Sequence, residues 1–217
     1  MRSDGRPDGL VQSCTVRKIL PLLISGVLLA CGRHVPNLDS PGKTIVCLGD
    51  SITSGVGSGP GEAYPERLAG RLGTEVINEG VSGDTAAQGL ARLDQVLADD
   101  PWMVIVELGG NDILRQVPPE QTERSLRQIL DRLLAARVVP VLVEVDAPFG
   151  ASYKKIYERL GDEYRVPVVE DALGKILRDR SLKSDTVHPN AEGQKVLAEA
   201  IAEEIAPILK ARRRGSR

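Results

Sequence analysis

Metal-binding side chains are scarce in this sequence. Its 217 residues include only three cysteines, Cys14, Cys31 and Cys47, and two histidines, His34 and His188. The cysteines lack the spacing of metal-ligand pairs, and they form no cluster with the histidines. A structural zinc site needs about four such ligands held together. The sequence therefore predicts no metal site.

An excess of charge of one sign is also missing. Lysine and arginine number 28 against 30 aspartate and glutamate, so the formal net charge is −2 and indicates no nucleic acid partner. The hydrophobic share of 41% and the charged share of 27% are typical of one soluble globular domain. A short basic run, Lys210 to Arg214, suits the end of a terminal helix. We expect residues 212–217 to form a solvated basic tail.

The glycine-rich motifs of nucleotide-binding proteins are absent. Gly55 and Gly57 begin a G-x-G, but Pro60 stands at the third glycine of the dinucleotide fingerprint. Residues 42–44 resemble the end of a P-loop, yet Asn37 stands where its first glycine belongs, and they precede a strand. The serine elbow G-x-S-x-G of the α/β-hydrolases is absent too. A flavin-binding module stays open on the fold alone.

No hydrophobic run is long enough to cross a bilayer, which takes about 20 apolar residues. The longest, from Ile19 to Ala30, follows Arg17 and Lys18 and is typical of a secretory signal peptide. It ends in Leu-Leu-Ala before Cys31, which resembles the lipobox of bacterial lipoproteins. We expect residues 1–31 to be a signal peptide with Cys31 lipidated, and the protein to be a membrane-anchored lipoprotein of the cell envelope or periplasm. A plain signal peptide and a buried helix are the alternatives.

The rest of the chain alternates strands with helices. Residues 32–43 are rich in Pro, Gly, Asn, Asp and Ser and are predicted to be a linker, followed by one domain over 44–211. Runs that are apolar at every position indicate strands buried on both faces. They are predicted over 44–48, 76–77, 103–108, 138–143 and 166–169. Amphipathic segments indicate helices over 65–71, 87–97, 119–136, 152–164, 171–178 and from 191 to about 210. This order predicts an α/β fold, a three-layer α/β/α sandwich with a parallel five-stranded sheet.

Polar, glycine-rich segments directly follow three of these strands. They are residues 49–51, 80–84 and 109–112. Because the carboxyl ends of parallel strands meet at one edge of a sheet, these segments are expected to converge there, where such folds place their sites.

The first segment contains Ser51 within Gly-Asp-Ser-Ile, which resembles the first block of the GDSL/SGNH hydrolases. Further blocks match in the same order, with Gly83 in residues 81–85, Asn111 in 109–112, and Asp185 and His188 in 185–189. The resemblance covers residues 44–209 and implies a flavodoxin-like SGNH hydrolase fold. Residues 82–85, 106–112, 121–123 and 126–130 look most like the bacterial periplasmic thioesterase/lysophospholipase and arylesterase subgroup. Residues 144–150 depart from that subgroup and are expected to border the acyl pocket.

The resemblance implies a catalytic triad. Ser51 is the expected nucleophile, His188 the base that takes its proton, and Asp185 the carboxylate that fixes the tautomer of His188. His188 is also the only histidine within the predicted domain, so it has no rival as a base. The alternatives are structural: Ser51 as a helix cap, Asp185 as a solvated loop residue and His188 as a surface residue.

The resemblance also implies an oxyanion hole. Its donors are expected to be the N–H of Ser51, the N–H of Gly83 and the side-chain amide of Asn111. Gly83 as a simple turn glycine and Asn111 as a structural asparagine are the alternatives. Asp50 and Asp112 are expected to brace their loops rather than react.

These residues predict a serine esterase. It would hydrolyse small-molecule carboxylic esters or thioesters, as arylesterases, acyl-CoA thioesterases and lysophospholipases do, through an acyl-serine intermediate and without a cofactor. A carbohydrate O-acetylesterase uses the same blocks and is the first alternative. A non-catalytic binding module on the same fold is the second.

Overall fold

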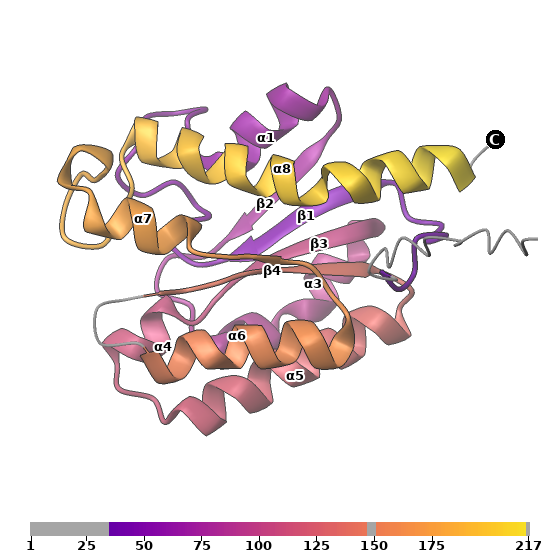
Figure 1. Ribbon diagram of the computed structural model, residues 1–217, viewed down its shortest axis with the longest axis horizontal. Coiled ribbons are helices and arrows are strands. Elements are labelled where there is room, and N and C mark those ends of the chain that lie inside the picture. Colours follow the sequence, from indigo (N-terminus) through magenta and orange to yellow (C-terminus); the bar gives the residue numbers. More distant parts are fainter. Residues whose placement is uncertain (1–34, 147–150, 216–217) are drawn as a thin grey trace, which may run out of the picture. The chain divides into compact units, whose positions relative to one another are not determined.

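A computed structural model describes residues 35–146 and 151–215 (Figure 1). Five parallel strands form one sheet in the order β2-β1-β3-β4-β5. The predicted signal peptide and Cys31 lie outside the described residues, as do 32–34 of the predicted linker. The strands are β1 (Thr44–Gly49), β2 (Val76–Gly80), β3 (Pro101–Glu107), β4 (Val139–Val143) and β5 (Val168–Val169).

Helices cover both faces of the sheet, which confirms the predicted three-layer sandwich. In Figure 1, α1 and α8 lie above the sheet, and α5 and α6 lie below it. This two-sided cover is why β3 and β4 are buried at every position. The helices are α1 (Tyr64–Leu72), α2 (Ala86–Ala91), α3 (Leu93–Ala98), α4 (Gly110–Leu114), α5 (Pro119–Ala135), α6 (Ala151–Tyr164), α7 (Ala172–Arg178) and α8 (Ala191–Gly215).

Strand β2 extends to Gly80, beyond the predicted 76–77, and three further differences have clear physical causes. The predicted helix over 87–97 is two helices, α2 and α3, which meet at Arg92. Helix α4 was not predicted, because five residues are too few to show a helical period. Strand β5 is shorter than 166–169, because the N–H of Val166 caps α6 by bonding to Gly161 O and Pro167 has no N–H to donate.

The two ends of the domain also differ from the predicted boundaries. Helix α8 continues to Gly215, so Arg212 is not part of a solvated tail. Its guanidinium lies 4.4 Å from the centre of the Trp102 ring and donates to Ser40 O and Gly42 O, both at 2.9 Å. The side chain of Asn37 donates to Leu134 O and Val138 O, both at 3.1 Å. Residues 35–43 of the predicted linker are therefore packed against the domain, beside the amino ends of the strands.

The described residues include no helix with the length and apolar character that crossing a membrane requires.

Candidate active site

Ser51 lies in the tight turn that follows β1, at the carboxyl edge of the sheet. Asp50 shapes this turn, because its Oδ1 accepts the N–H of Ile52 at 2.9 Å and its carbonyl accepts the N–H of Ser54 at 3.0 Å. The turn lies so close to β2 that a Cβ on Gly80 would come within 2.2 Å of Ser54 N. Tight packing of this kind fixes the direction in which the Ser51 hydroxyl points.

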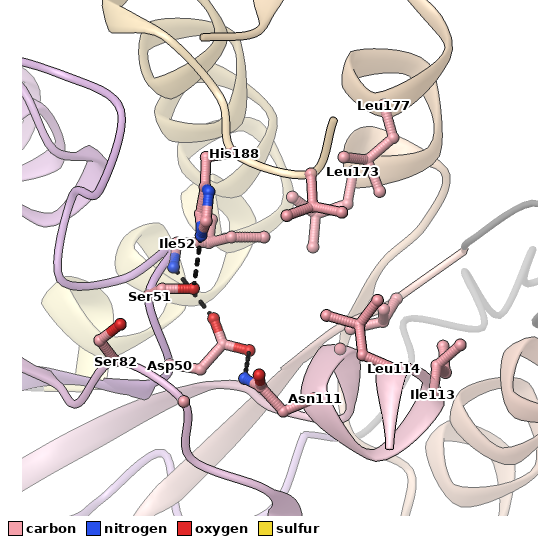
Figure 2. A pocket seen from close by; sticks show the side chains of 14 residues that line it. Asp50, Ser51, Ile52, Ser82, Asn111, Ile113, Leu114, Leu173, Leu177 and His188 are labelled. Atoms are coloured by element: carbon pink, nitrogen blue, oxygen red, sulfur yellow. Dashed lines mark hydrogen bonds between the residues drawn. The ribbon is translucent and has the colours of Figure 1, made fainter. Parts of the chain in front are cut away.

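His188 and Asp185 approach Ser51 from the loop between α7 and α8. The Nε2 of His188 lies 3.0 Å from Ser51 Oγ, and its Nδ1 lies 2.7 Å from Asp185 Oδ2 (Figure 2 shows the first of these contacts). The other carboxylate oxygen of Asp185 accepts the N–H groups of Val187 and His188, both at 2.8 Å. The structure thus brings the three predicted triad residues into one hydrogen-bonded line.

These hydrogen bonds keep Asp185 ionised. The bond from the His188 side chain, followed by the two backbone N–H bonds, lowers the pKa of Asp185 to about 2. Its side chain is 51% exposed, so the cause is hydrogen bonding to the charged form and not a buried partner charge. A carboxylate is therefore present beside the imidazole throughout the neutral and mildly acidic pH range.

The loop that carries Asp185 and His188 closes on itself just before α8. Lys183 forms an antiparallel bridge with Pro189, and the N–H of Ser184 donates to His188 O at 3.0 Å. Gly57, at φ +95°, packs against this loop, and a Cβ there would lie 2.2 Å from Ser184 Oγ. The close approach explains the glycine and shows that the turn after Ser51 supports the loop of His188.

Two backbone N–H groups at the site are available to a substrate oxygen. Among the described residues, no acceptor takes the N–H of Ser51 or of Gly83. Gly83 has φ +90°, a conformation that side chains disfavour, and its carbonyl accepts from Arg115 Nη2 at 2.8 Å. A Cβ on Gly83 would meet only the flexible end of Arg115, at 3.4 Å. The glycine is therefore required by its backbone angle more than by lack of space.

The amide of Asn111 has a different arrangement from the one expected. Its Nδ2 donates to Asp50 Oδ2 at 2.9 Å and to Asp84 O at 3.0 Å, as Figure 2 shows for Asp50. Both N–H groups of the amide are thus used within the protein. Asn111 lies beside Ser51 and Gly83 in the pocket lining, but it reaches an oxyanion only by exchanging one of these two bonds. Asp112 braces its loop as expected, accepting from Ala86 N and Thr122 Oγ1.

Sequence reasoning missed three polar residues that hold the site together. The first is Arg92, which donates to Asp84 Oδ2 at 2.7 Å, to Glu79 O at 2.7 Å and to Gly49 O at 3.0 Å. It ties the ends of β1 and β2 to the loop of Gly83. The local sequence carries no signal that separates it from a surface arginine, because the break between α2 and α3 appears only in the structure.

The second and third are Gln194 and Glu107, both fully buried. Gln194 donates to Ile52 O at 2.9 Å and accepts the N–H of Tyr64 at 2.9 Å, so it joins α8 to the turn of Ser51 and to α1. Glu107 ends β3 behind the same turn and accepts from Thr53 Oγ1 at 2.9 Å. A carboxyl at the end of an otherwise apolar strand was its signal.

An apolar cavity of about 240 Å³ opens beside Ser51 and His188. Figure 2 shows Ile113 and Leu114 of α4 on one side of it and Leu173 and Leu177 of α7 on the other. Leu114 is 63% exposed, a large apolar side chain left facing solvent at the rim. Such a lining fits a hydrocarbon group next to the serine. Within the described part of the chain, no three His, Cys, Asp or Glu side chains are grouped to hold a metal ion.

Comparison with known proteins gives matches over most of the chain. The profile of the GDSL-like lipase/acylhydrolase family matches residues 47–196. A protein of Escherichia coli K12 named thioesterase 1/protease 1/lysophospholipase L1 is 36% identical over 76% of this chain and 85% of its own length. An arylesterase of Vibrio mimicus is 30% identical over 86% of this chain and 98% of its own. The crystal structure of a TesA protein superposes with a TM-score of 0.72 at 28% identity, over 76% of this chain and 99% of that one.

Proposed function

The chain belongs to the GDSL-like lipase/acylhydrolase family and is a serine esterase, and on that basis we propose that it cleaves esters and thioesters of apolar acyl groups with Ser51 as nucleophile. The observation that carries the proposal is the line of hydrogen bonds from Ser51 through His188 to Asp185. A hydroxyl alone is a weak nucleophile, and an adjacent base held by a third group is the arrangement that activates it.

Catalysis proceeds in two halves. Asp185 accepts the Nδ1–H of His188, which leaves Nε2 free to take the proton of Ser51 as its oxygen attacks the carbonyl carbon. The tetrahedral intermediate collapses when His188 returns this proton to the leaving alcohol or thiol. A water molecule then attacks the acyl-serine, with His188 as base again, and releases the carboxylic acid.

The developing oxyanion is stabilised by N–H groups at the serine. We assign the N–H of Ser51 and of Gly83 as donors, since no described acceptor occupies them. Asn111 becomes the third donor by turning one N–H of its amide away from its present acceptor, Asp50 or Asp84. One donor of this kind contributes about 3–4 kcal/mol to stabilising the transition state.

The cavity lining favours acyl chains over sugars as the group beside Ser51. Its walls carry isoleucine, leucine and valine side chains, which gain from burying methylene groups. The thioesterase, lysophospholipase and arylesterase named among the relatives support the same substrate range. A carbohydrate O-acetylesterase would use the same triad but leave this apolar wall without a partner.

A series of p-nitrophenyl esters from acetate upward, with acyl-CoA and lysophospholipid added, tests the proposal. We expect kcat/KM to rise by up to roughly fourfold per methylene, at about 0.8 kcal/mol each, until the cavity is filled. Leu173→Ala and Leu177→Ala should flatten that rise while leaving acetate hydrolysis nearly intact. Turnover confined to acetylated sugars would favour the O-acetylesterase, and no turnover on any ester would contradict catalysis.

We further propose that the enzyme works in the cell envelope, anchored through a lipid on Cys31. The support is the apolar run that ends in Leu-Leu-Ala before Cys31. Residues 35–43 pack beside the amino ends of the strands, opposite the edge that carries Ser51. A tether joined there leaves the catalytic edge open to soluble substrates. Fractionation and palmitate labelling of the full-length protein beside a Cys31→Ser variant test the anchor, and unlabelled soluble wild-type protein would contradict it.

A further inference from the structure

Two buried carboxyl groups lie directly behind the turn of Ser51. Asp50 is 2% exposed and Glu107 is fully buried. Asp50 contacts both halves of the site, because its Oδ1 accepts from Ile52 N in the turn of the nucleophile and its Oδ2 accepts from Asn111 Nδ2, each at 2.9 Å. The position of Asp50 therefore sets the position of both the turn of Ser51 and the side-chain amide of Asn111.

Glu107 lies beside the start of the same turn, since it pairs in register with Gly49, the residue before Asp50. Its Oε2 accepts from Thr53 Oγ1 at 2.9 Å, and that hydroxyl lies 3.0 Å from Tyr64 OH. Its Oε1 is buried, and no donor among the described residues serves it. Both carboxyls are buried at the same turn, and the nearby Asp50 raises the pKa of Glu107 beyond the effect of burial. Two ionised carboxylates buried side by side repel each other, so we expect one of the pair to hold a proton, which also serves the unpartnered Oε1.

The hydrogen bonds show which one. Both oxygens of Asp50 already accept N–H groups, which favours its ionised form. Glu107 Oε1 is the oxygen that lacks a donor, so a proton placed there satisfies it and is donated to Asp50. This assignment keeps the negative charge on the carboxylate that accepts two N–H groups. In the reverse assignment the charge would rest on the fully buried Glu107, whose one other donor among the described residues is the Thr53 hydroxyl, and that is costlier.

We propose that Glu107 is a positioning residue of the esterase reaction: it is neutral in the working enzyme, and its proton holds Asp50 as the ionised acceptor that orients Asn111 and the turn of Ser51. The inference rests on the proposed function of Ser51. Glu107 touches no substrate and acts through Asp50.

The surroundings of the pair agree with a neutral Glu107. Burial raises the pKa of Glu107 well above its usual value, and the nearby Asp50 raises it further. Burial also raises the pKa of Asp50, while the hydrogen bonds from Ile52, Glu107 and Asn111 oppose this. The other titratable groups near the pair are Cys47 of β1, Tyr64 of α1, Tyr157 of α6 and His188, and the charges of Asp112 and Glu144 also act on Tyr157.

Of these groups only His188 can carry a positive charge, and only while it holds a proton. A second ionised carboxyl would therefore have no buried cation to compensate it. During catalysis, the ionised Asp50 faces His188 as the histidine takes the proton of Ser51. If Glu107 stays neutral, Asp50 carries the one negative charge of the pair, and that charge stays in a fixed place.

Two variants of Glu107 separate positioning from structure. Glu107→Gln keeps a neutral side chain of the same shape that can donate to Asp50 and accept from Thr53. Glu107→Leu fills the same space without either bond. We expect Glu107→Leu to lower kcat by roughly 10²-fold with KM little changed, because the reacting groups are misplaced, and Glu107→Gln to restore most of that loss. Met103→Leu, equally buried on β3, is the control for repacking this strand.

Infrared spectroscopy reads the proton directly and independently of activity. The carbonyl stretching band of a buried protonated carboxylic acid, which shifts in D₂O, should be present in wild-type protein at neutral pH and absent from Glu107→Gln. The band also shows whether Glu107 is protonated if Glu107→Leu fails to fold. Absence of the band from wild type, or equal loss of kcat in Glu107→Gln and Glu107→Leu, would overturn the proposal. An inactive enzyme that still shows the band would contradict the esterase function and not the protonated pair.

Discussion

The Nε2 atom of His188 lies 3.0 Å from the Oγ atom of Ser51, although 137 positions separate the two residues in the chain. Ser51 is placed by the end of a central strand, and His188 by a closed loop at the start of the last helix. The contact therefore exists only in the folded domain, and the following variants test what it does.

Asp185 should be required as a carboxylate. Replacing it with asparagine allows donation to Nδ1 of His188, which favours the tautomer whose Nε2 carries a proton and cannot accept one from Ser51. We expect Asp185→Asn to lower kcat/KM by at least about 10²-fold, without exceeding the loss in Ser51→Ala. Because the pKa of Asp185 is lowered to about 2, the wild-type carboxylate stays ionised throughout, so the loss should be similar at every assay pH above about 5. Full activity in Asp185→Asn would contradict its role.

Asn111 should act on the transition state. Changing it to alanine is expected to lower kcat by roughly 10²–10³-fold with a much smaller change in KM, because the oxyanion exists only along the reaction path. The variant also loses the bonds to Asp50 and Asp84, so its thermal unfolding must be measured beside the kinetics. A raised KM with unchanged kcat would make Asn111 a substrate-positioning residue instead.

Glu107 should make stability fall as pH rises. A free glutamate ionises at about pH 4.3, whereas burial raises the pKa of Glu107 in the folded protein. Above the pKa of the unfolded state, unfolding releases the proton of Glu107. The stability that protonated Glu107 contributes is therefore complete below that pKa and is lost as pH rises toward the folded-state pKa. Glu107→Gln lacks this proton release. The melting temperature of Glu107→Gln minus that of wild type should therefore become larger as the pH rises from about 5 to about 8. The exposed Glu75→Gln is the control, and a constant difference across this range would count against a protonated Glu107.

Arg212 should stabilise the domain through the segment that precedes β1. It donates to the carbonyls of Leu38, Ser40 and Gly42 and stacks on Trp102. Hydrogen bonds from a charged donor are the stronger kind, so we expect Arg212→Ala to lower the free energy of unfolding by about 2 kcal/mol. Arg213→Ala, on an exposed neighbour, should change it by less than about 0.5 kcal/mol. Equal effects in urea unfolding would show that residues 35–43 are not held by Arg212.

Much of the site could be predicted because Ser51 and the expected oxyanion donors stand in short blocks directly after strands, while Asp185 and His188 stand in a block of their own before the last helix. Ser51, Gly83 and Asn111 follow β1, β2 and β3, so an alternation of apolar and glycine-rich segments is enough to bring them to one edge. The same alternation predicted the five-stranded sheet and the three layers. The predicted element boundaries were wrong where tertiary contacts decide them, as at Pro167 and at the C-terminal extension of α8.

The supporting residues could not be predicted, since their burial depends on partners far along the chain. Arg92 is a surface residue by local pattern, yet in the fold it binds Gly49 O and Asp84. Arg212 belongs to a basic run typical of a solvated tail, and only the folded domain places Trp102 beneath it. The two acceptors of the Asn111 amide are likewise a matter of side-chain geometry, which short motifs do not specify.

The most direct test of the account compares Ser51→Ala, His188→Ala and the double variant in p-nitrophenyl ester hydrolysis, with circular dichroism to verify folding. Because nucleophile and base act as one unit, we expect each single change to lower kcat by roughly 10⁴-fold or more and the double change to cost no more than either alone. Wild-type turnover in a folded Ser51→Ala protein would contradict the mechanism.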